Sequence, residues 1–522
     1  MAKRTPRGRK AQPKRQAAPL RRAASAADLE RLLDEVDAAL EGGDPARMQT
    51  LLEPLWAARE RLPEVLTRRL IEGRVAIPAF SFQLLQGFAG PKAATYLRRI
   101  AEDRSVPDIV RWGAQRRAGW PARGEAKRRL AFLATLNDPL GALVMATAEA
   151  VNAWPPGGEI LEEVIGYLAV MPSDQRRAAL ERLVQELDDA AVWLLHAALH
   201  LPDPAAQRYV LGELVRLRDP AAAGPIERLA RTTRDTTLRD EATAALQRLG
   251  LHVVGAAAPP EPFAFPPVER VLMSVVDGAG AQIILLLRDL GPAGVVVADF
   301  LLKEGVGVKD AFGLSHVQPA EIEDIMEQFV SDAVDLVEVD LPAARGALAA
   351  AVAVNAATGQ ALPVKYELWE PLVHDAYPPP ADEPITAPEL DDTPYADRPD
   401  LLRQSGRLAD HDFFLSWGFD TPQTTMAMLG SPPPRGGRWT DRQYRPMLEQ
   451  LMPPPVRAQL RERLRRQAWL LEREGDTASR DVALAVAAAL PNATTEALAR
   501  VPFWRRLVEN SVQQFAAQLF DL

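Results

Sequence analysis

The sequence contains no cysteine among its 522 residues. This absence excludes disulfide bonds, thiolate metal ligands and a cysteine nucleophile. It is also more typical of a reducing, cytoplasmic setting than of a secreted protein. No uninterrupted apolar run is long enough to span a membrane, and the N-terminus lacks the apolar core of a secretory signal. The sequence therefore predicts a cytoplasmic protein without membrane association.

Histidine is scarce, with six residues in the chain. His196 and His200 lie four residues apart, which is the spacing of the His-Glu-x-x-His metalloproteases, but Ala197 stands where the general base would be. No third ligand is evident. We therefore expect packing or surface histidines, with weak affinity for a divalent metal as the alternative.

Other catalytic patterns are also missing. There is no Gly-x-Ser-x-Gly elbow, and the adjacency of Ser315 and His316 does not by itself arrange a nucleophile and a base. Asp391 and Asp392 fall in a proline-rich stretch, where we expect solvated charges rather than a tuned acid pair. The sequence favours a protein that is not an enzyme and implies no cofactor.

The glycine-rich stretches DGAGAQ and KEGVGVKDAFG lack the Gly-Lys-Ser/Thr ending of a P-loop and the three-glycine dinucleotide fingerprint. Asp-Gly between two apolar runs is typical of a hairpin turn. Ligand contact is the alternative, and the polar side chains near these turns would then be its candidates: Asp277, Gln282, Lys309 and Asp310.

Charge is unevenly distributed along the chain. Residues 1–22 contain nine Lys or Arg and no acid, although the whole chain has a net charge of −9. A flexible basic arm attracts polyanions, whereas a net-acidic body tends to repel them. We predict a disordered basic tail over 1–24, with nucleic-acid contact as an alternative role.

Short helical runs occupy residues 25–250. Ser25 and Asp28 form a capping-box pattern before an apolar stripe, and Asp-Pro pairs at Asp44, Asp138, Asp203 and Asp219 are typical helix starts. Each stripe is too small to sustain an isolated helix, so neighbouring helix pairs must cover one another.

Two of these units resemble a known family. DPAAAGPIERLA followed by LRDEATAALQRLG is similar to a HEAT repeat of the bacterial, bilin-lyase-associated type, with Asp219-Pro220, Pro225 and Arg239 at the family's characteristic positions. GPKAATYLRRIAEDRSVPDIVRWGAQR repeats the plan, with Arg111 as its arginine. The resemblance implies a HEAT-like α-solenoid over residues 25–250, but it does not imply lyase activity, because fold analogy alone cannot establish a site.

The remaining sequence predicts a mainly helical protein with further modules. We expect a Pro/Ala linker over 251–266 and a small α+β domain with an antiparallel meander over 267–373, in which VKYELWEPL returns as a strand. An acidic, proline-rich and poorly ordered linker should follow over 374–402. A helical C-terminal domain should then occupy 403–522.

A basic stretch in the repeats suggests a binding surface. From Lys92 to Arg129 there are eleven basic residues and four acids. We predict a non-catalytic scaffold that binds a protein partner through the solenoid, and the alternative is nucleic-acid binding through the basic arm and this arginine-rich face. The predicted surface comprises Arg98, Arg99, Arg104, Arg111, Trp112, Arg116 and Arg117.

Overall fold

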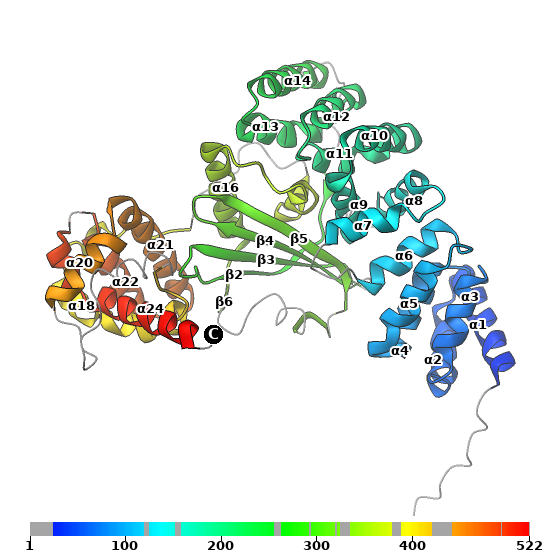
Figure 1. Cartoon of the computed structure of the whole chain (residues 1–522), viewed down its shortest axis with the longest axis horizontal. Helices are drawn as coiled ribbons and strands as arrows, with labels where there is room; N and C mark the ends of the chain where they lie inside the picture. Colours follow the sequence, from blue (N-terminus) through cyan, green and yellow to red (C-terminus); the bar gives the residue numbers. More distant parts are fainter. Residues whose placement is uncertain are drawn as a thin grey trace, which may run out of the picture. The chain divides into compact units, whose positions relative to one another are not determined.

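The computed structural model of the chain describes residues 25–119, 125–151, 158–254, 263–291, 294–318, 321–323, 335–377, 388–419, 441–491 and 493–520. The predicted basic tail, 1–24, lies outside these ranges. The chain divides into two compact units, residues 1–142 and 143–522, so the predicted solenoid spans their boundary. The described part is mainly helical and contains a five-stranded antiparallel sheet, which agrees with the predicted fold class at that level (Figure 1).

The first unit is built from short helices that contact their neighbours in the sequence. Helix α1 contacts α2 and α3, α3 contacts α4 and α5, and α6 contacts α4 and α5. One core, including Leu33, Leu66, Leu97 and Ile100, runs through them. The elements are α1 (Ala26–Glu41), α2 (Pro45–Ala57), α3 (Leu62–Ile71), α4 (Pro78–Ala89), η1 (Gly90–Lys92), α5 (Ala93–Glu102), α6 (Asp108–Ala118) and α7 (Glu125–Leu133), and α8 (Pro139–Val151) crosses the boundary.

The predicted helix starts are confirmed. Ser25 accepts a hydrogen bond from the amide of Asp28, whose carboxylate accepts one from the Ser25 amide, so the capping box is complete. Asp44, Asp203 and Asp219 each cap a helix that has proline in its first turn. These caps satisfy amides that have no partner within the helix.

In three pairs of successive helices, an arginine of the second helix caps the C-terminal end of the first. Arg111 Nε donates to the carbonyl of Ala101 at 2.9 Å, at the end of α5. Arg176 Nε donates to the carbonyl of Leu168 at 2.6 Å, and Arg239 donates to that of Thr233 at 2.7 Å. The last carbonyls of a helix lack intrahelical partners, and a cation there also favours the helix dipole. In each of these three pairs, the arginine therefore joins one helix to the next.

We expect Arg111→Met to weaken the first unit by about 2 kcal/mol, because it removes charged hydrogen bonds from buried carbonyls. Arg111 is 1% exposed and also donates to the carbonyl and the hydroxyl of Thr135, at 2.9 and 2.8 Å. Hydrogen exchange of the α5 and α6 amides should then be faster by more than tenfold. Arg98→Met, at an exposed position of α5, is the control. Equal exchange in both variants would contradict the capping role.

The helices of the second unit that precede the sheet continue the pairing. Helix α10 contacts α12, α12 contacts α14, and α13 contacts α14. In both motif-bearing stretches a 3₁₀ turn leads into a ten-residue helix, η1 into α5 and η3 into α13. The elements are α9 (Gly158–Val170), α10 (Ser173–Leu187), η2 (Asp188–Ala191), α11 (Val192–Ala198), α12 (Pro204–Leu217), η3 (Pro220–Ala222), α13 (Ala223–Thr232) and α14 (Thr236–Val254).

The predicted meander is confirmed. The sheet has the strand order β5-β4-β3-β2-β6, and every pairing in it is antiparallel. DGAG forms the β2–β3 turn, and Gly280 adopts the positive φ of 78° that favours glycine. The strands are β2 (Val268–Ser274), β3 (Ala281–Asp289), β4 (Val295–Lys303), β5 (Gly307–Val317) and β6 (Leu336–Glu338), while β1 (Phe263–Ala264) pairs separately with β7 (Ala376–Tyr377).

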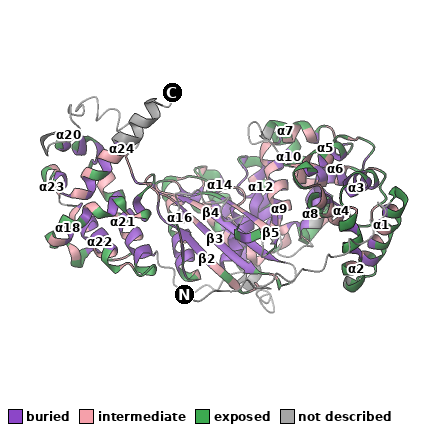
Figure 2. Ribbon diagram, turned by 90° about the horizontal axis from the view of Figure 1, so that it is seen from below, coloured by how far each residue is buried: buried purple, intermediate pink, exposed green. Residues whose placement is uncertain are grey.

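Helices cover one face of the sheet. Helix α16 (Leu341–Thr358) contacts β2, β4 and β5, and α17 (Tyr366–Trp369) contacts β5. The central strands are buried along most of their length (Figure 2). A cluster that includes Leu285, Leu287 and Val297 forms the core on the other face.

The prediction of a strand in VKYELWEPL is wrong. Residues 366–369 form α17, and η6 (Glu370–Val373) continues it as a 3₁₀ helix. A helical turn brings Glu367 and Glu370 to the same arginine, whereas a strand would point residues three apart to opposite faces.

The C-terminal region is helical, as predicted. Helix α21 contacts α22, and α20 contacts α23. The elements are η7 (Thr393–Tyr395), α18 (Pro399–Gln404), η8 (Ser405–Asp410), η9 (Asp412–Phe414), α20 (Asp441–Leu451), α21 (Pro454–Arg473), α22 (Thr477–Ala489), α23 (Thr495–Ala499) and α24 (Pro502–Phe520).

The predicted linkers are corrected in part. Helix α14 extends to Val254 inside the expected 251–266 linker. Within 374–402, Asp392 is fully buried and accepts two hydrogen bonds from Arg461, at 2.7 and 2.8 Å. The expectation of a solvated Asp392 is therefore wrong, because an arginine 69 residues away compensates its burial, whereas Asp391 is exposed as predicted. Among the described helices, none has the length and apolarity needed to cross a membrane.

Candidate functional site

Two residues of the predicted basic surface are buried and cannot belong to it. Arg111 is 1% exposed and Trp112 is 3% exposed. Arg111 holds the end of α5, so its guanidinium is not available to a partner. The inclusion of Arg111 and Trp112 in a binding surface is therefore wrong, because a sequence records charge and aromaticity but not the direction in which a side chain points.

The other predicted surface residues remain at least partly exposed. Arg98 and Arg104 are exposed, and Arg99 pairs with Glu64 at 2.8 Å. Arg116 is half-buried, and Arg117 lies over the ring of Phe82 at 5.0 Å. These arginines stay candidates for contact with a partner.

An exposed aromatic surface lies on α2 and α4. Trp56 is 58% exposed and Leu52, one turn earlier, is 44% exposed. The Trp56 ring lies 5.6 Å from that of Phe88, and the guanidinium of Arg59 lies 5.6 Å from the Trp56 ring. We call Leu52, Trp56 and Phe88 the aromatic patch. Exposed Trp with adjacent Arg is typical of the centre of protein–protein interfaces.

The two spaced histidines bind different structural partners. His196 Nε2 lies 2.9 Å from a carboxylate oxygen of Asp219, the residue that caps η3. His200 Nε2 lies 2.8 Å from Glu367. The described residues include no group of three or more His, Asp or Glu side chains arranged to hold a metal. The packing role is the interpretation that these contacts favour.

The polar residues near the sheet turns support the turns themselves. Asp277 Oδ1 accepts a hydrogen bond from the Ala281 amide at 2.6 Å, and Gln282 Nε2 donates to the Ser274 carbonyl at 2.9 Å. Asp310 Oδ1 accepts from the Ala311 amide at 2.9 Å. The hairpin interpretation of DGAG is thus confirmed.

Three further residues named in the sequence analysis, Lys309, Ser315 and His316, lie on β5. Lys309 is exposed, and the Ser315 amide donates to a carboxylate oxygen of Glu159 at 3.2 Å. The side chain of His316 lies outside the described residues.

A buried ionic cluster joins the helices to the sheet domain. The Arg228 guanidinium, on α13, lies between the carboxylates of Glu367 and Glu370, which are 1% and 7% exposed. His200 and His374 contact these two carboxylates at 2.8 and 3.0 Å. Burial raises the pKa of Glu367, but Arg228 and the hydrogen bond to His200 outweigh burial and hold it below its ordinary value.

The buried carboxyl of Asp299 has a raised pKa, in contrast to that of Glu367. Asp299, on β4, is 1% exposed, and its Oδ1 has no hydrogen-bond partner. Burial, with a further contribution from the charge of Asp310, raises the pKa of Asp299 to about 8. Asp299 lies directly opposite Leu285 of the neighbouring strand β3, so both are on one face of the sheet, in apolar surroundings that favour the neutral acid.

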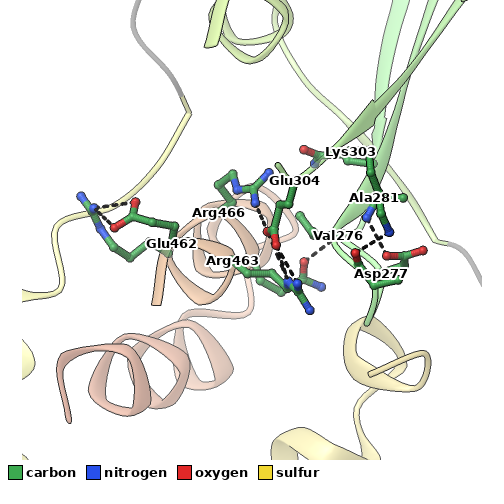
Figure 3. A network of polar contacts seen from close by, with 12 residues as sticks. Val276, Asp277, Ala281, Lys303, Glu304, Glu462, Arg463 and Arg466 are labelled. Atoms are coloured by element: carbon green, nitrogen blue, oxygen red, sulfur yellow. Dashed lines mark hydrogen bonds and ion pairs between the residues drawn. The ribbon is translucent and has the colours of Figure 1, made fainter. Parts of the chain in front are cut away.

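The sheet also contacts the C-terminal helices through a polar network (Figure 3). The Glu304 carboxylate, at the β4–β5 turn, accepts hydrogen bonds from both Arg463 and Arg466 of α21. The Val276 amide donates to Gln467 at 3.0 Å. A Cβ on Gly278 would lie 2.2 Å from the Ser416 carbonyl oxygen, so only glycine permits this close approach.

A cavity of about 680 Å³ opens beside this network. The ends of β3 and β4, the β4–β5 turn, α16 and α21 contribute to its wall. We call it the junction cavity. Of the polar residues named from the sequence as candidates for ligand contact, Gln282 lines this cavity, whereas Asp277, Lys309 and Asp310 do not. The other contributions come from two stretches far apart in the sequence, the arginine-rich RAQLRERLRR and the small residues of GALAAAVAV, which the sequence alone does not bring together.

Comparison with protein-family models, with curated protein sequences and with solved structures finds no match to this chain, so the assignment of function depends on the geometry described above.

Proposed function

We propose that the protein is a non-catalytic interaction scaffold that binds a protein partner through the aromatic patch. The observation that carries this proposal is the exposure of Trp56, at 58%, beside the ring of Phe88. Large exposed aromatics are costly to leave in water and are enriched at the energetic centres of protein interfaces. Arg59, next to Trp56, would add a cation that can pair with a carboxylate of the partner.

The proposal includes a HEAT-like solenoid as the support of the patch. Support comes from the contacts of each helix with its sequence neighbours and from the arginines that cap one helix from the next. Within the first unit, the contacts of α2 with α1 and of α4 with α3 and α5 would hold the patch in one arrangement before the partner arrives. A preorganised surface loses less conformational entropy on association.

Nucleic-acid binding remains the second candidate, because Arg98 and Arg104 are exposed on the first unit. Binding of that kind would depend on charge and would weaken steeply as salt rises. Binding through an aromatic patch depends on apolar area and should survive moderate salt. Salt dependence thus separates the two functions.

We expect Trp56→Ser to weaken binding of the partner by at least about thirtyfold, which corresponds to roughly 2 kcal/mol for an interfacial tryptophan. The measurement is capture of proteins from nuclease-treated lysate on the immobilised full chain at two salt concentrations, with quantification of each captured protein. The proposal requires a protein that the wild-type chain retains at both salt concentrations and the Trp56→Ser chain does not.

Met145→Ser is the matched control, since Met145 is 54% exposed and lies outside the patch. It should retain the same protein as the wild-type chain. Equal loss with both variants would indicate nonspecific adhesion. Retention of nuclease-sensitive polyanion alone, reduced by Arg98→Ala with Arg104→Ala, would favour the nucleic-acid function instead.

A further inference from the structure

We propose that the junction cavity binds a small amphipathic carboxylate, a molecule with an apolar body and one anionic end. This inference concerns a site in the second unit and does not depend on the protein-binding role of the aromatic patch.

The size and the walls of the cavity fit such a molecule. Its volume, about 680 Å³, lies within the range of small-molecule sites. Ala347, Ala350 and Val354 of α16 face the space together with Leu302 of β4 and Pro454 of α21. Small and apolar side chains leave room for a hydrocarbon body and favour its removal from water.

Two cations at the cavity have carbonyl partners in place of carboxylates. Arg457 donates to the carbonyls of Met452 and Ala493, both at 2.7 Å, and Lys303 donates to the carbonyl of Ala279. Neither forms an ion pair with any residue that the structure describes. A carbonyl oxygen satisfies hydrogen bonds but does not neutralise a full charge, so an anion placed beside either cation would gain from it.

The adjacent polar network also contains fewer carboxylates than guanidinium groups. Arg463 and Arg466 share the single carboxylate of Glu304. Burial lowers the pKa of Arg466, Glu304 opposes this effect, and the like charge of Arg463 adds to it. The residues that line the cavity include four cations and three anions, so its wall has one positive charge in excess, whereas the whole chain has a net charge of −9. The cations are Lys303, Arg457, Arg461 and Arg466, and the anions are Glu304, Glu389 and Glu462.

A calorimetric titration of the full chain with decanoate tests the proposal. We expect saturable binding of one decanoate per chain, with affinity at least tenfold higher than for 1-decanol or decylammonium, which have the same body and a neutral or cationic end. Ala350→Trp, which fills the cavity from an exposed position of α16, should weaken binding at least tenfold. Lys303→Met should weaken it about tenfold.

Ala353→Trp is the control, because Ala353 is exposed on the same helix and does not line the cavity. It should change the affinity less than twofold, and circular dichroism should be unchanged in all three variants. The proposal is contradicted by the absence of saturable decanoate binding, by equal affinity for the three probes, or by Ala350→Trp and Lys303→Met both binding like wild type. Sedimentation with phosphatidylglycerol vesicles without binding of dissolved decanoate would indicate a membrane surface and would also contradict it.

Discussion

Replacement of Arg228 by Met should lower the stability of the contact between α13 and α17 by about 4 kcal/mol at pH 7, the magnitude typical of breaking a buried ion pair. The substitution leaves Glu367 and Glu370 with no cation between them, although both carboxylates are almost fully buried. Hydrogen exchange of the α13 and α17 amides should become faster by several hundredfold. Exchange reports this local stability without assuming that the whole chain unfolds in one step.

The pH dependence of this effect has a definite sign. In the wild-type protein Arg228 helps hold the pKa of Glu367 and of Glu370 below the ordinary value of 4.5, so their stabilisation is present above that pH and is lost as the pH falls below it. In Arg228→Met the unneutralised carboxylates are relieved by protonation. The difference between the two proteins should therefore shrink between pH 7 and pH 4.

Arg231→Met is the matched control. Arg231 lies on the same helix, is 56% exposed and pairs with the exposed Glu227, so its loss should cost less than about 0.5 kcal/mol. Similar exchange rates in the Arg228 and Arg231 variants would show that the cluster does not hold the helices to the sheet domain.

Replacement of Asp299 by Val should stabilise the sheet domain by roughly 3 kcal/mol at pH 8. The pKa of Asp299 is raised to about 8, so the folded protein favours the neutral acid and loses stability as the pH rises from 4 through 8. Valine has no proton to lose and suits a strand. Thermal unfolding should show a higher Tm for the variant at pH 8 and a similar Tm at pH 4.

Asp310→Asn is a second variant that tests the cause of the raised pKa of Asp299. The charge of Asp310 contributes to the raised pKa of Asp299, so its removal should reduce the loss of stability between pH 4 and pH 8 without abolishing it. If Asp299→Val were destabilised by the same amount at pH 4 and at pH 8, the assignment of Asp299 as a buried, neutral acid would be wrong.

Local patterns in the sequence predicted local structure. The capping box at Ser25 and the Asp-Pro starts of α2 and α12 depend on residues within one helical turn, and the β2–β3 turn depends on four adjacent residues. Their geometry is decided within the segment itself. No distant contact overrides it.

The contacts that the sequence did not reveal join distant residues. Arg228 meets Glu367 across 139 positions, and Asp392 meets Arg461 across 69. A list of charges cannot pair residues at such separations, and it cannot tell the buried Arg111 from the exposed Arg98. The strand prediction for the short run 364–372 is wrong because an apolar segment of that length fits a strand or a helical turn equally well.

The most direct test of the interaction-scaffold proposal replaces Trp56 with a photoreactive phenylalanine analogue in the full chain. Irradiation in lysate should form a covalent product between the analogue at position 56 and one protein, and the same analogue in place of Met145 should not form it. Cross-links from position 56 to nucleic acid alone, or the same products from both positions, would contradict the proposal that the aromatic patch binds a protein partner.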